Sequence, residues 1–210
     1  MVKPVLNGVS ASIIDYKRLG SSSEFALKVF GKHNRNNAEV ALAVSSVAEI
    51  DHKVAMEALN KFSGTWRRFD YKGALTTGSF LYDDYAHHPT EIMATLNGAR
   101  EAYPKKNIVL VFQPHLYSRT KLLLDDFAEA LSKADRIIVA DIYASREKND
   151  GSITSEELVK KIKEKNENVL YISDFEKIGE EIMASTNGKD IVITMGAGDI
   201  YKVGEKLLDK

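Results

Sequence analysis

Residues 107–120, NIVLVFQPHLYSRT, join an apolar run to a cluster of polar side chains. The run NIVLVF is typical of a buried strand, and the periodic apolar pattern that follows indicates a helix. Between them, the chain places a histidine, a tyrosine, a serine and an arginine. Because open α/β sheets bind their ligands at the carboxyl ends of their strands, this segment predicts a ligand site at that edge.

The same order of apolar run, polar loop and helical period recurs along the chain. Five strands are predicted, at 79–84, 107–112, 135–143, 169–173 and 190–195. Helices are predicted near 89–103, 120–132, 154–165, 174–186 and 199–208. Strict alternation of this kind predicts an α/β fold with a doubly wound, Rossmann-like and mostly parallel sheet. Three of the five histidines, His87, His88 and His115, fall on loops at the predicted ligand edge.

Composition excludes several classes of protein. The 210 residues include 29 basic and 30 acidic side chains without a Lys/Arg block, so we expect neither a nucleic-acid nor a membrane partner. The absence of cysteine excludes disulfides and thiolate metal sites. The amino end lacks a signal-peptide pattern, and no apolar run approaches the ~18 residues of a membrane span. We therefore expect a soluble, cytoplasmic protein.

The composition of the chain changes near Trp66. Residues 1–30 contain the strand-like pieces SASIIDY and EFALKVF around the turn LGSSS, which predicts a hairpin. Two helices are expected next, at 34–48 and 53–61. Residues 1–66 therefore read as part of a domain, and residues 67–210 as a complete α/β domain.

Six motifs resemble the successive signatures of the Mur ligases, in the order of that family. They are GKHNRNNAEVALAV, FSGTWRRFDY, DDYAHHPTEI, FQPHLYSRT, DIYASREKNDG and MGAGDIY. The resemblance runs from about Gly31 to the carboxy terminus, and it implies the tail of the central ATP-binding domain joined to the carboxy-terminal amino-acid-binding domain. FQPHLYSRT together with DDYAHHPTE is similar to the members that add L-alanine.

The resemblance implies an ATP-driven ligation in peptidoglycan synthesis. The carboxylate of UDP-N-acetylmuramate would become an acyl phosphate, and the amine of L-alanine would displace the phosphate. ATP and Mg²⁺ are the implied cofactors. The family's P-loop is absent, since Gly31-Lys32 and Gly188-Lys189 are followed by His and Asp without a glycine-rich loop upstream. We therefore expect the sugar site and the Mg²⁺ ligands outside these residues, and no catalysis by this chain alone. The alternative is a non-catalytic nucleotide or small-molecule binding module of the same fold.

Two polar residues near the start of the first predicted helix are candidates for binding adenine. His33 and Asn37 are spaced i, i+4 and can share a helix face, where an Asn amide can pair with both edges of adenine. The plainer interpretation of this Asn-rich stretch is a helix cap. The resemblance favours the adenine contact.

Further candidates lie after the domain boundary. The resemblance implies that Arg68, directly before a Phe, contacts the nucleotide and that Asp83 binds its ribose. Arg67 is expected to be a solvated arginine on a linker. Asp84 is expected to cap a turn.

Tyr85, His87 and Arg119 are the candidates for binding the incoming amino acid. A guanidinium can pair bidentately with the α-carboxylate, while Tyr and His position the other polar atoms. In several family members, arginine replaces Leu116, so Leu116→Arg is expected to compensate in part for the loss of Arg119. For His115, which could orient its neighbour, a structural role is as well supported as a catalytic one.

For His88, too, a structural role is as well supported as a catalytic one, because it precedes Pro89 at a predicted helix start. A metal site at the three histidines is less well supported than the amino-acid site, because adjacent His87 and His88 would diverge. Gly196 and Gly198 lack the full dinucleotide motif and are expected to let the backbone approach the substrate. Residues 145–152 are expected to form a mobile, solvated loop.

Overall fold

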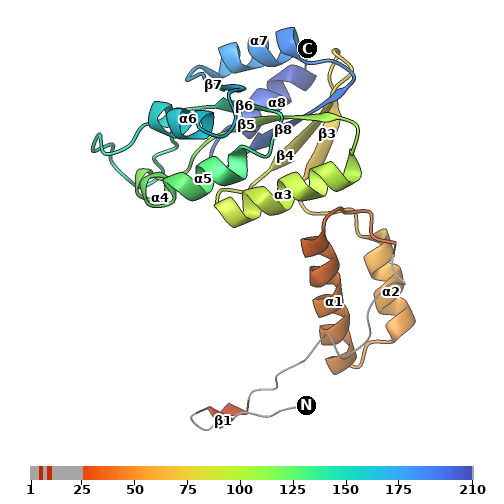
Figure 1. Ribbon diagram of the computed structural model, residues 1–210. Helices are drawn as coiled ribbons and strands as arrows, with labels where there is room; N and C mark the ends of the chain where they lie inside the picture. Colours follow the sequence, from red (N-terminus) through yellow and green to blue (C-terminus); the bar gives the residue numbers. More distant parts are fainter. Residues whose placement is uncertain (1–4, 7–8, 11–25, 210) are drawn as a thin grey trace. The chain divides into compact units, whose positions relative to one another are not determined.

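The computed structural model describes residues 5–6, 9–10 and 26–209. The chain divides into two compact units, Met1–Ser63 and Gly64–Lys210 (Figure 1). The sequence places the boundary after Trp66, whereas this residue belongs with the second unit. Its ring meets that of Tyr201 edge-on, with 6.4 Å between the centroids. The connector that follows the first unit is therefore anchored on the second.

In the first unit, two helices pack against each other. They are α1, Lys32–Val47, and α2, His52–Lys61, and they confirm the two helices predicted here. Their buried residues are alanines at 38, 43 and 55, whose small side chains allow the helices to approach closely. Strands β1, Val5–Leu6, and β2, Val9–Ser10, pair antiparallel. Most of the predicted hairpin of SASIIDY and EFALKVF lies outside the described residues.

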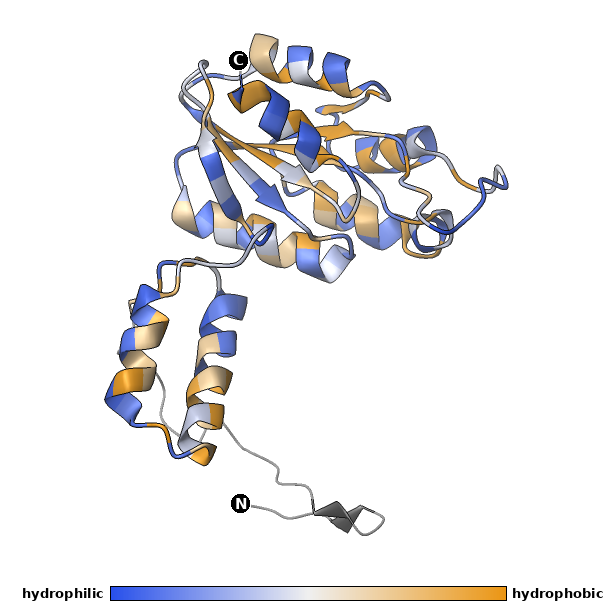
Figure 2. Cartoon of the chain, turned by 180° about the vertical axis from the view of Figure 1, so that it is seen from behind, coloured by the Kyte–Doolittle hydropathy of each residue, from blue (hydrophilic) through white to orange (hydrophobic). Residues whose placement is uncertain are grey.

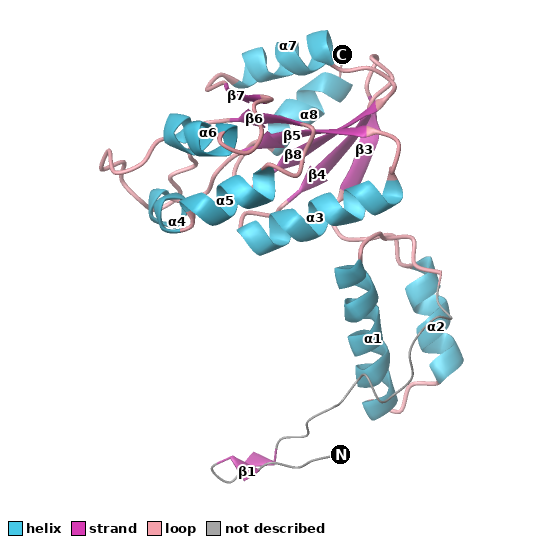
Figure 3. Cartoon of the chain, viewed as in Figure 1, coloured by secondary structure: helices cyan, strands magenta, loops and turns pink. Residues whose placement is uncertain are grey.

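The second unit contains a six-stranded sheet (Figure 3). Its strands are Asp70–Ala74 (β3), Phe80–Asp84 (β4), Asn107–Phe112 (β5), Arg136–Val139 (β6), Val169–Tyr171 (β7) and Asp190–Met195 (β8). The order is β3-β4-β8-β5-β6-β7. Only β3 is antiparallel to its neighbour, so the carboxyl ends of the other five strands share one edge.

Helices cover both faces of this sheet (Figure 1). Their bounds are Pro89–Ala102 (α3), Tyr117–Leu122 (α4), Leu124–Leu131 (α5), Ser155–Lys163 (α6), Phe175–Ser185 (α7) and Tyr201–Leu208 (α8). One core packs α3, α5 and α6 against one face, and a second core packs α7 and α8 against the other. The predicted doubly wound, mostly parallel α/β fold is confirmed. The helix expected at 120–132 is two helices that meet at Leu123.

The middle strands form because they are apolar on both sides, as parallel strands covered by helices require. Every residue of β8 is buried, and β5 is buried from Ile108 onward. Figure 2 shows these central strands as hydrophobic. The additional strand β3 was not predicted, because DYKGA is polar and contains a bulge between Tyr71 and Gly73. In the described part of the chain, none of the helices combines the length and the apolar character needed to cross a membrane.

Candidate functional site

The loops after β4 and β5 bring four predicted site residues together at the carboxyl edge of the sheet. Tyr85 and His87 follow β4, and their ring centroids lie 5.5 Å apart. His115 follows β5, with its ring centroid 5.7 Å from that of His87. Arg119, on α4, has Nη1 3.3 Å from Nδ1 of His115. We call Tyr85, His87, His115 and Arg119 the edge cluster.

Hydrogen bonds determine which ring nitrogens of the two histidines carry protons. His87 Nδ1 lies 3.0 Å from the carbonyl oxygen of Tyr85, which can only accept, so this nitrogen is the donor. In a neutral His87 ring, Nε2 is therefore free to accept a proton or a hydrogen bond. For His115 the order is reversed: Arg119 can only donate, so Nδ1 of His115 accepts. This hydrogen bond orients Arg119, and it supports the interpretation that His115 orients a neighbouring residue.

The surroundings of His115 favour its neutral form. Burial, followed by the positive charge of Arg119, lowers the pKa of His115 below 6.5. His87 and Arg146 act in the same direction, and Glu147 opposes them. A neutral ring is the form that can accept the hydrogen bond from Arg119.

The lowered pKa of His115 predicts a loss of stability in acid. As pH falls, the unfolded chain takes up this proton first, so the stability that neutral His115 contributes is present above its unfolded pKa. It is lost as pH falls from about 6.5 through the folded-state pKa. We expect His115→Asn, whose amide oxygen can accept from Arg119 without titrating, to remove this component. Urea unfolding at several pH values between about 7.5 and 5 measures it, since that range spans the ordinary histidine pKa. Identical pH profiles of the two proteins would contradict the assignment.

Arg67 is buried beneath this cluster, and its expected role as a solvated linker arginine is wrong. Only 4% of the residue is exposed. Its Nε lies 2.6 Å from Asp83 Oδ2, and Nη2 and Nη1 donate to the carbonyl oxygens of Gly196 and Gly198 at 2.6 and 3.3 Å. A buried guanidinium is stable only where acceptors meet its donors, and this pocket of the protein supplies them.

The two acidic residues at the end of β4 are used inside the protein. Asp83 is 2% exposed, and its second oxygen, Oδ1, accepts from Thr194 Oγ1 at 2.8 Å. Burial raises the pKa of Asp83, while Arg67 and Thr194 hold it down in part. Since both carboxylate oxygens are engaged, the geometry argues against the predicted ribose contact. Asp84 accepts from the backbone N–H of Ala86 at 2.8 Å and so caps a turn, as expected.

The other predicted nucleotide contacts are exposed to solvent. The guanidinium of Arg68 lies 6.0 Å from the ring centroid of Tyr85, beside the edge cluster. His33 and Asn37 lie one turn apart on α1 in the first unit. Since α1 has no side-chain cap, the alternative of an Asn cap is not supported at its start. The nucleotide role of these three residues stays a prediction.

His88 has a structural role. It occupies the N-cap position of α3, directly before Pro89, and accepts from the backbone N–H of Thr90 at 3.3 Å. Histidine is an uncommon cap, but its Nδ1 satisfies one of the N–H groups left free at a helix start. The metal interpretation of the histidines gains no support, because the described residues contain no group of three or more metal-ligating side chains.

Gly196 and Gly198 are required by the packing of the chain itself. A Cβ atom at Gly196 would lie 2.6 Å from the carbonyl oxygen of Gln113. At Gly198 it would lie 2.7 Å from the ring of Tyr143 and still closer to the side-chain oxygen of Gln113. The close approach expected toward a substrate is therefore an approach to Gln113 and Tyr143, because the loop after β8 packs directly on the end of β5.

Sequence reasoning missed Tyr143, whose ring stacks on that of His115 at 5.8 Å. The Tyr of DIY, just beyond β6, was the available signal. It also missed Glu147, which accepts from the backbone N–H of Ser118 at 3.0 Å and from the Ser118 hydroxyl. These bonds lower the pKa of Glu147 and tie the loop at 145–152 to α4. The loop expected to be mobile therefore has a tether beside the edge cluster.

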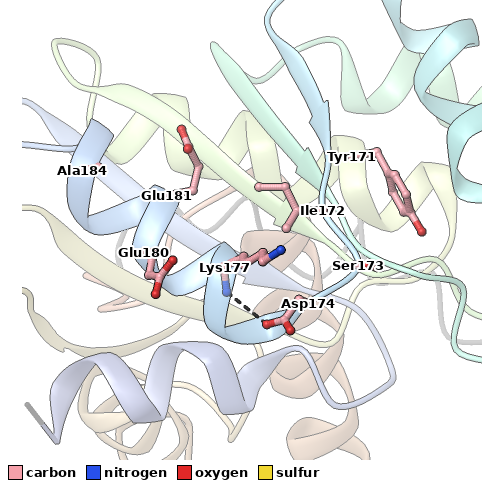
Figure 4. A pocket seen from close by; sticks show the side chains of 8 residues that line it. All are labelled: Tyr171, Ile172, Ser173, Asp174, Lys177, Glu180, Glu181 and Ala184. Carbon is pink, nitrogen blue, oxygen red and sulfur yellow. Dashed lines mark hydrogen bonds between the residues drawn. The ribbon is translucent and has the colours of Figure 1, made fainter.

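A depression of about 540 Å³ lies elsewhere, between the end of β7 and α7 (Figure 4). Tyr171, Asp174, Lys177 and Glu181 are among the residues that line it. Asp174 is used as the cap of α7, where it accepts from the backbone N–H of Lys177 at 3.1 Å. None of the edge-cluster residues lines this depression, so we do not assign the candidate site to it.

Fold and site together define an α/β domain in which the edge cluster gathers at the carboxyl edge of the parallel strands, where open α/β sheets bind their ligands. A family model described as "Mur ligase, glutamate ligase domain" matches residues 67–198. The chain belongs to the Mur ligase family, which confirms the resemblance drawn from the six motifs.

Two relatives are ligases that act with L-alanine by name. The UDP-N-acetylmuramate--L-alanine ligase of Caldanaerobacter subterraneus subsp. tengcongensis is 48% identical over 200 residues, which is 95% of this chain and 43% of that ligase. The ligase of the same name from Agathobacter rectalis is 47% identical, over 88% of this chain and 40% of the relative. This chain therefore spans less than half of the length of either relative.

Solved structures show the same fold. The UDP-N-acetylmuramate-alanine ligase of Thermotoga maritima has a TM-score of 0.74 and 28% identity, over 88% of this chain and 39% of that chain. A domain of a putative ligase from Haemophilus ducreyi has a TM-score of 0.51 and 22% identity, over 68% of this chain and 98% of that chain. The second likeness concerns the fold alone, and its coverage is that of a single domain.

Proposed function

We propose that this chain is the carboxy-terminal part of an ATP-dependent ligase that joins L-alanine to UDP-N-acetylmuramate in cytoplasmic peptidoglycan synthesis. The observation that carries the proposal is the edge cluster, in which one guanidinium and two imidazoles meet at the ligand edge of the sheet. The names of the two relatives support L-alanine as the amino acid.

The side chains of the edge cluster match the groups of an amino acid. Arg119 uses one donor for His115 and keeps its other N–H groups for an α-carboxylate. His87 offers Nε2 as an acceptor, because its Nδ1 bonds to the carbonyl oxygen of Tyr85. An amine must lose a proton when it attacks an acyl phosphate, and an acceptor beside it can take that proton. Tyr85 would flank the bound amino acid.

Nucleotide binding belongs to other residues in this proposal. His33 and Asn37 would contact adenine, and Arg68 would pair with a phosphate of ATP. Asp83 and Asp84 do not suit Mg²⁺, because internal hydrogen bonds engage their oxygens. Mg²⁺ and the UDP-sugar would be held by residues beyond those of this chain, and Mg²⁺ would offset the negative charge of the phosphates.

A chimera tests the proposal. This chain would replace the matching 200 residues of the Caldanaerobacter ligase, which is 48% identical there. We expect the chimera to release ADP and phosphate only when UDP-N-acetylmuramate and L-alanine are both present, and the isolated 210-residue chain to release none. Turnover by the isolated chain would refute the second expectation. A folded chimera that binds nucleotide without L-alanine-dependent turnover would favour the non-catalytic binding module.

A further inference from the structure

Arg67 contacts the edge cluster as well as the loop after β8. Its guanidinium carbon lies 4.9 Å from the ring centroid of Tyr85 and 4.6 Å from that of Tyr201 on α8. Its backbone carbonyl oxygen accepts from the backbone N–H of Tyr85 at 2.8 Å. Arg67 therefore touches Tyr85 from two directions.

These contacts join three separate pieces of chain. Through Asp83 and Tyr85, Arg67 is bonded to the end of β4, and through the carbonyl oxygens of Gly196 and Gly198 it holds the loop after β8. The ring of Tyr201 adds a cation–π contact, which is stronger where the cation is shielded from water. A buried charge that loses one acceptor pays a large desolvation cost, so this arrangement permits little movement.

The connector around Arg67 has an unusual backbone. Arg67 and Phe69 both lie in the left-handed region, with φ of 54° and 48°. Non-glycine residues keep such conformations only where the surrounding contacts impose them. Phe69 is held by the bond from its N–H to Asp84 Oδ2, at 2.8 Å, and by stacking on Tyr82 at 4.3 Å. The path of the connector and the end of β4 are therefore fixed together.

We infer that Arg67 is a positioning residue, which sets the place of Tyr85 and of the loop at Gly196 and Gly198 and so adjusts the amino-acid site from the connector. The inference rests on the proposed function only for the identity of the ligand. The arrangement of Tyr85 and the loop by Arg67 can be observed without any ligand.

The test uses the 210-residue chain labelled for NMR, with L-alanine as the probe. Arg67→Lys keeps the charge but loses the planar fork. Arg136→Lys is the matched control, because Arg136 is also part of an ion pair, with Glu181, but lies at the amino end of β6. Tyr201→Leu removes the ring on Arg67, and Tyr201→Phe keeps it. Thermal unfolding establishes that each variant is folded.

In the ligand-free proteins, we expect Arg67→Lys to shift the amide signals of Tyr85, Gly196 and Gly198, and Arg136→Lys to leave them in place. With L-alanine, Arg67→Lys should weaken binding about tenfold, because a displaced Tyr85 and loop would cost the amino acid about one hydrogen bond. Tyr201→Leu should weaken binding in the same direction, and Tyr201→Phe should restore it.

The outcomes test the positioning role of Arg67 separately from the proposed amino-acid site. If the amide signals of Tyr85 and the loop stay in place in Arg67→Lys, Arg67 does not position them. If the signals move while the affinity for L-alanine is unchanged, Arg67 is merely structural, and the inference is overturned. Should the wild-type chain fail to bind L-alanine, the proposed amino-acid site fails, while the ligand-free comparison still decides whether Arg67 arranges the edge.

Discussion

Arg67→Met should lower the free energy of unfolding of the second unit by about 3–5 kcal/mol, the usual cost of removing one partner of a buried ion pair. The substitution leaves the carboxylate of Asp83 buried, with only Thr194 as a side-chain donor. It also leaves the carbonyl oxygens of Gly196 and Gly198 without their donor. Urea unfolding at pH 7 measures this loss in the free energy of unfolding. The fluorescence of the single tryptophan, Trp66, reports it, because its ring lies beside Arg67.

The loss should depend on the charge of Asp83. Arg67→Met/Asp83→Asn should recover at least half of it, because the side chain at position 83 is then neutral and no carboxylate is left there without its arginine partner. Since burial raises the folded-state pKa of Asp83, lowering the pH toward 3.8 should also reduce the penalty, as the acid becomes neutral. Arg136→Met is the control: its pair with Glu181 is partly exposed, so the expected cost is below about 1 kcal/mol. Equal losses in the two single variants would contradict the buried pair.

The sequence predicts the second unit well, because its strands and helices have distinct hydrophobic periods. Strands such as β5 and β8 are apolar throughout, and the Gly or polar loops after them mark their ends. Strand β3 lacks such a continuous apolar run, because an edge strand needs an apolar face on one side only. DYKGA also contains a bulge, so the alternation of its side chains is interrupted. The second unit starts at Gly64, close to the boundary predicted from composition, and Trp66 meets the ring of Tyr201 far along the chain, a contact that composition does not reveal.

For the site, sequence position predicts which loop a residue occupies but not which way its side chain turns. Tyr85, His87, His115 and Arg119 follow strand ends, so their gathering at one edge follows from the topology. Arg67 and Arg68 are adjacent and chemically identical, and only the fold buries the first and exposes the second. The burial of Asp83 has the same cause, since its partners, Arg67 and Thr194, come from other segments.

Leu116 shows a further limit of sequence reasoning. The resemblance to the Mur ligases predicts that Leu116→Arg supplies a second cation for the amino acid. In the structure, Leu116 is buried and has φ of 71°, a conformation that favours glycine or asparagine. An arginine at this buried position would have its charge removed from water unless its side chain turned out of the site that Leu116 occupies. The structure therefore argues against compensation by Leu116→Arg for a change at Arg119.

Arg119→Lys, tested in the chimera with the Caldanaerobacter ligase, should raise the requirement for L-alanine far more than that for ATP. The expected loss in transition-state binding is about 2 kcal/mol, the scale of one charge-assisted hydrogen bond. The structure adds a reason: Arg119 donates to His115 and can still reach a carboxylate with its other nitrogens, whereas the single ammonium of lysine cannot keep both geometries.

Steady-state kinetics with each substrate varied in turn measures this effect. Lys121→Arg is the control for an exchange between lysine and arginine, because Lys121 is exposed on the same helix. His115→Asn should change the L-alanine requirement less than Arg119→Lys does, because an amide oxygen can still accept from Arg119. If Arg119→Lys affected both substrates equally, Arg119 would serve the fold of α4 and not the amino acid. If Arg119→Lys had no effect while His115→Asn raised the requirement for L-alanine, the α-carboxylate would be bound by the imidazoles of His115 and His87. Arg119 would then not be the residue that recognises it.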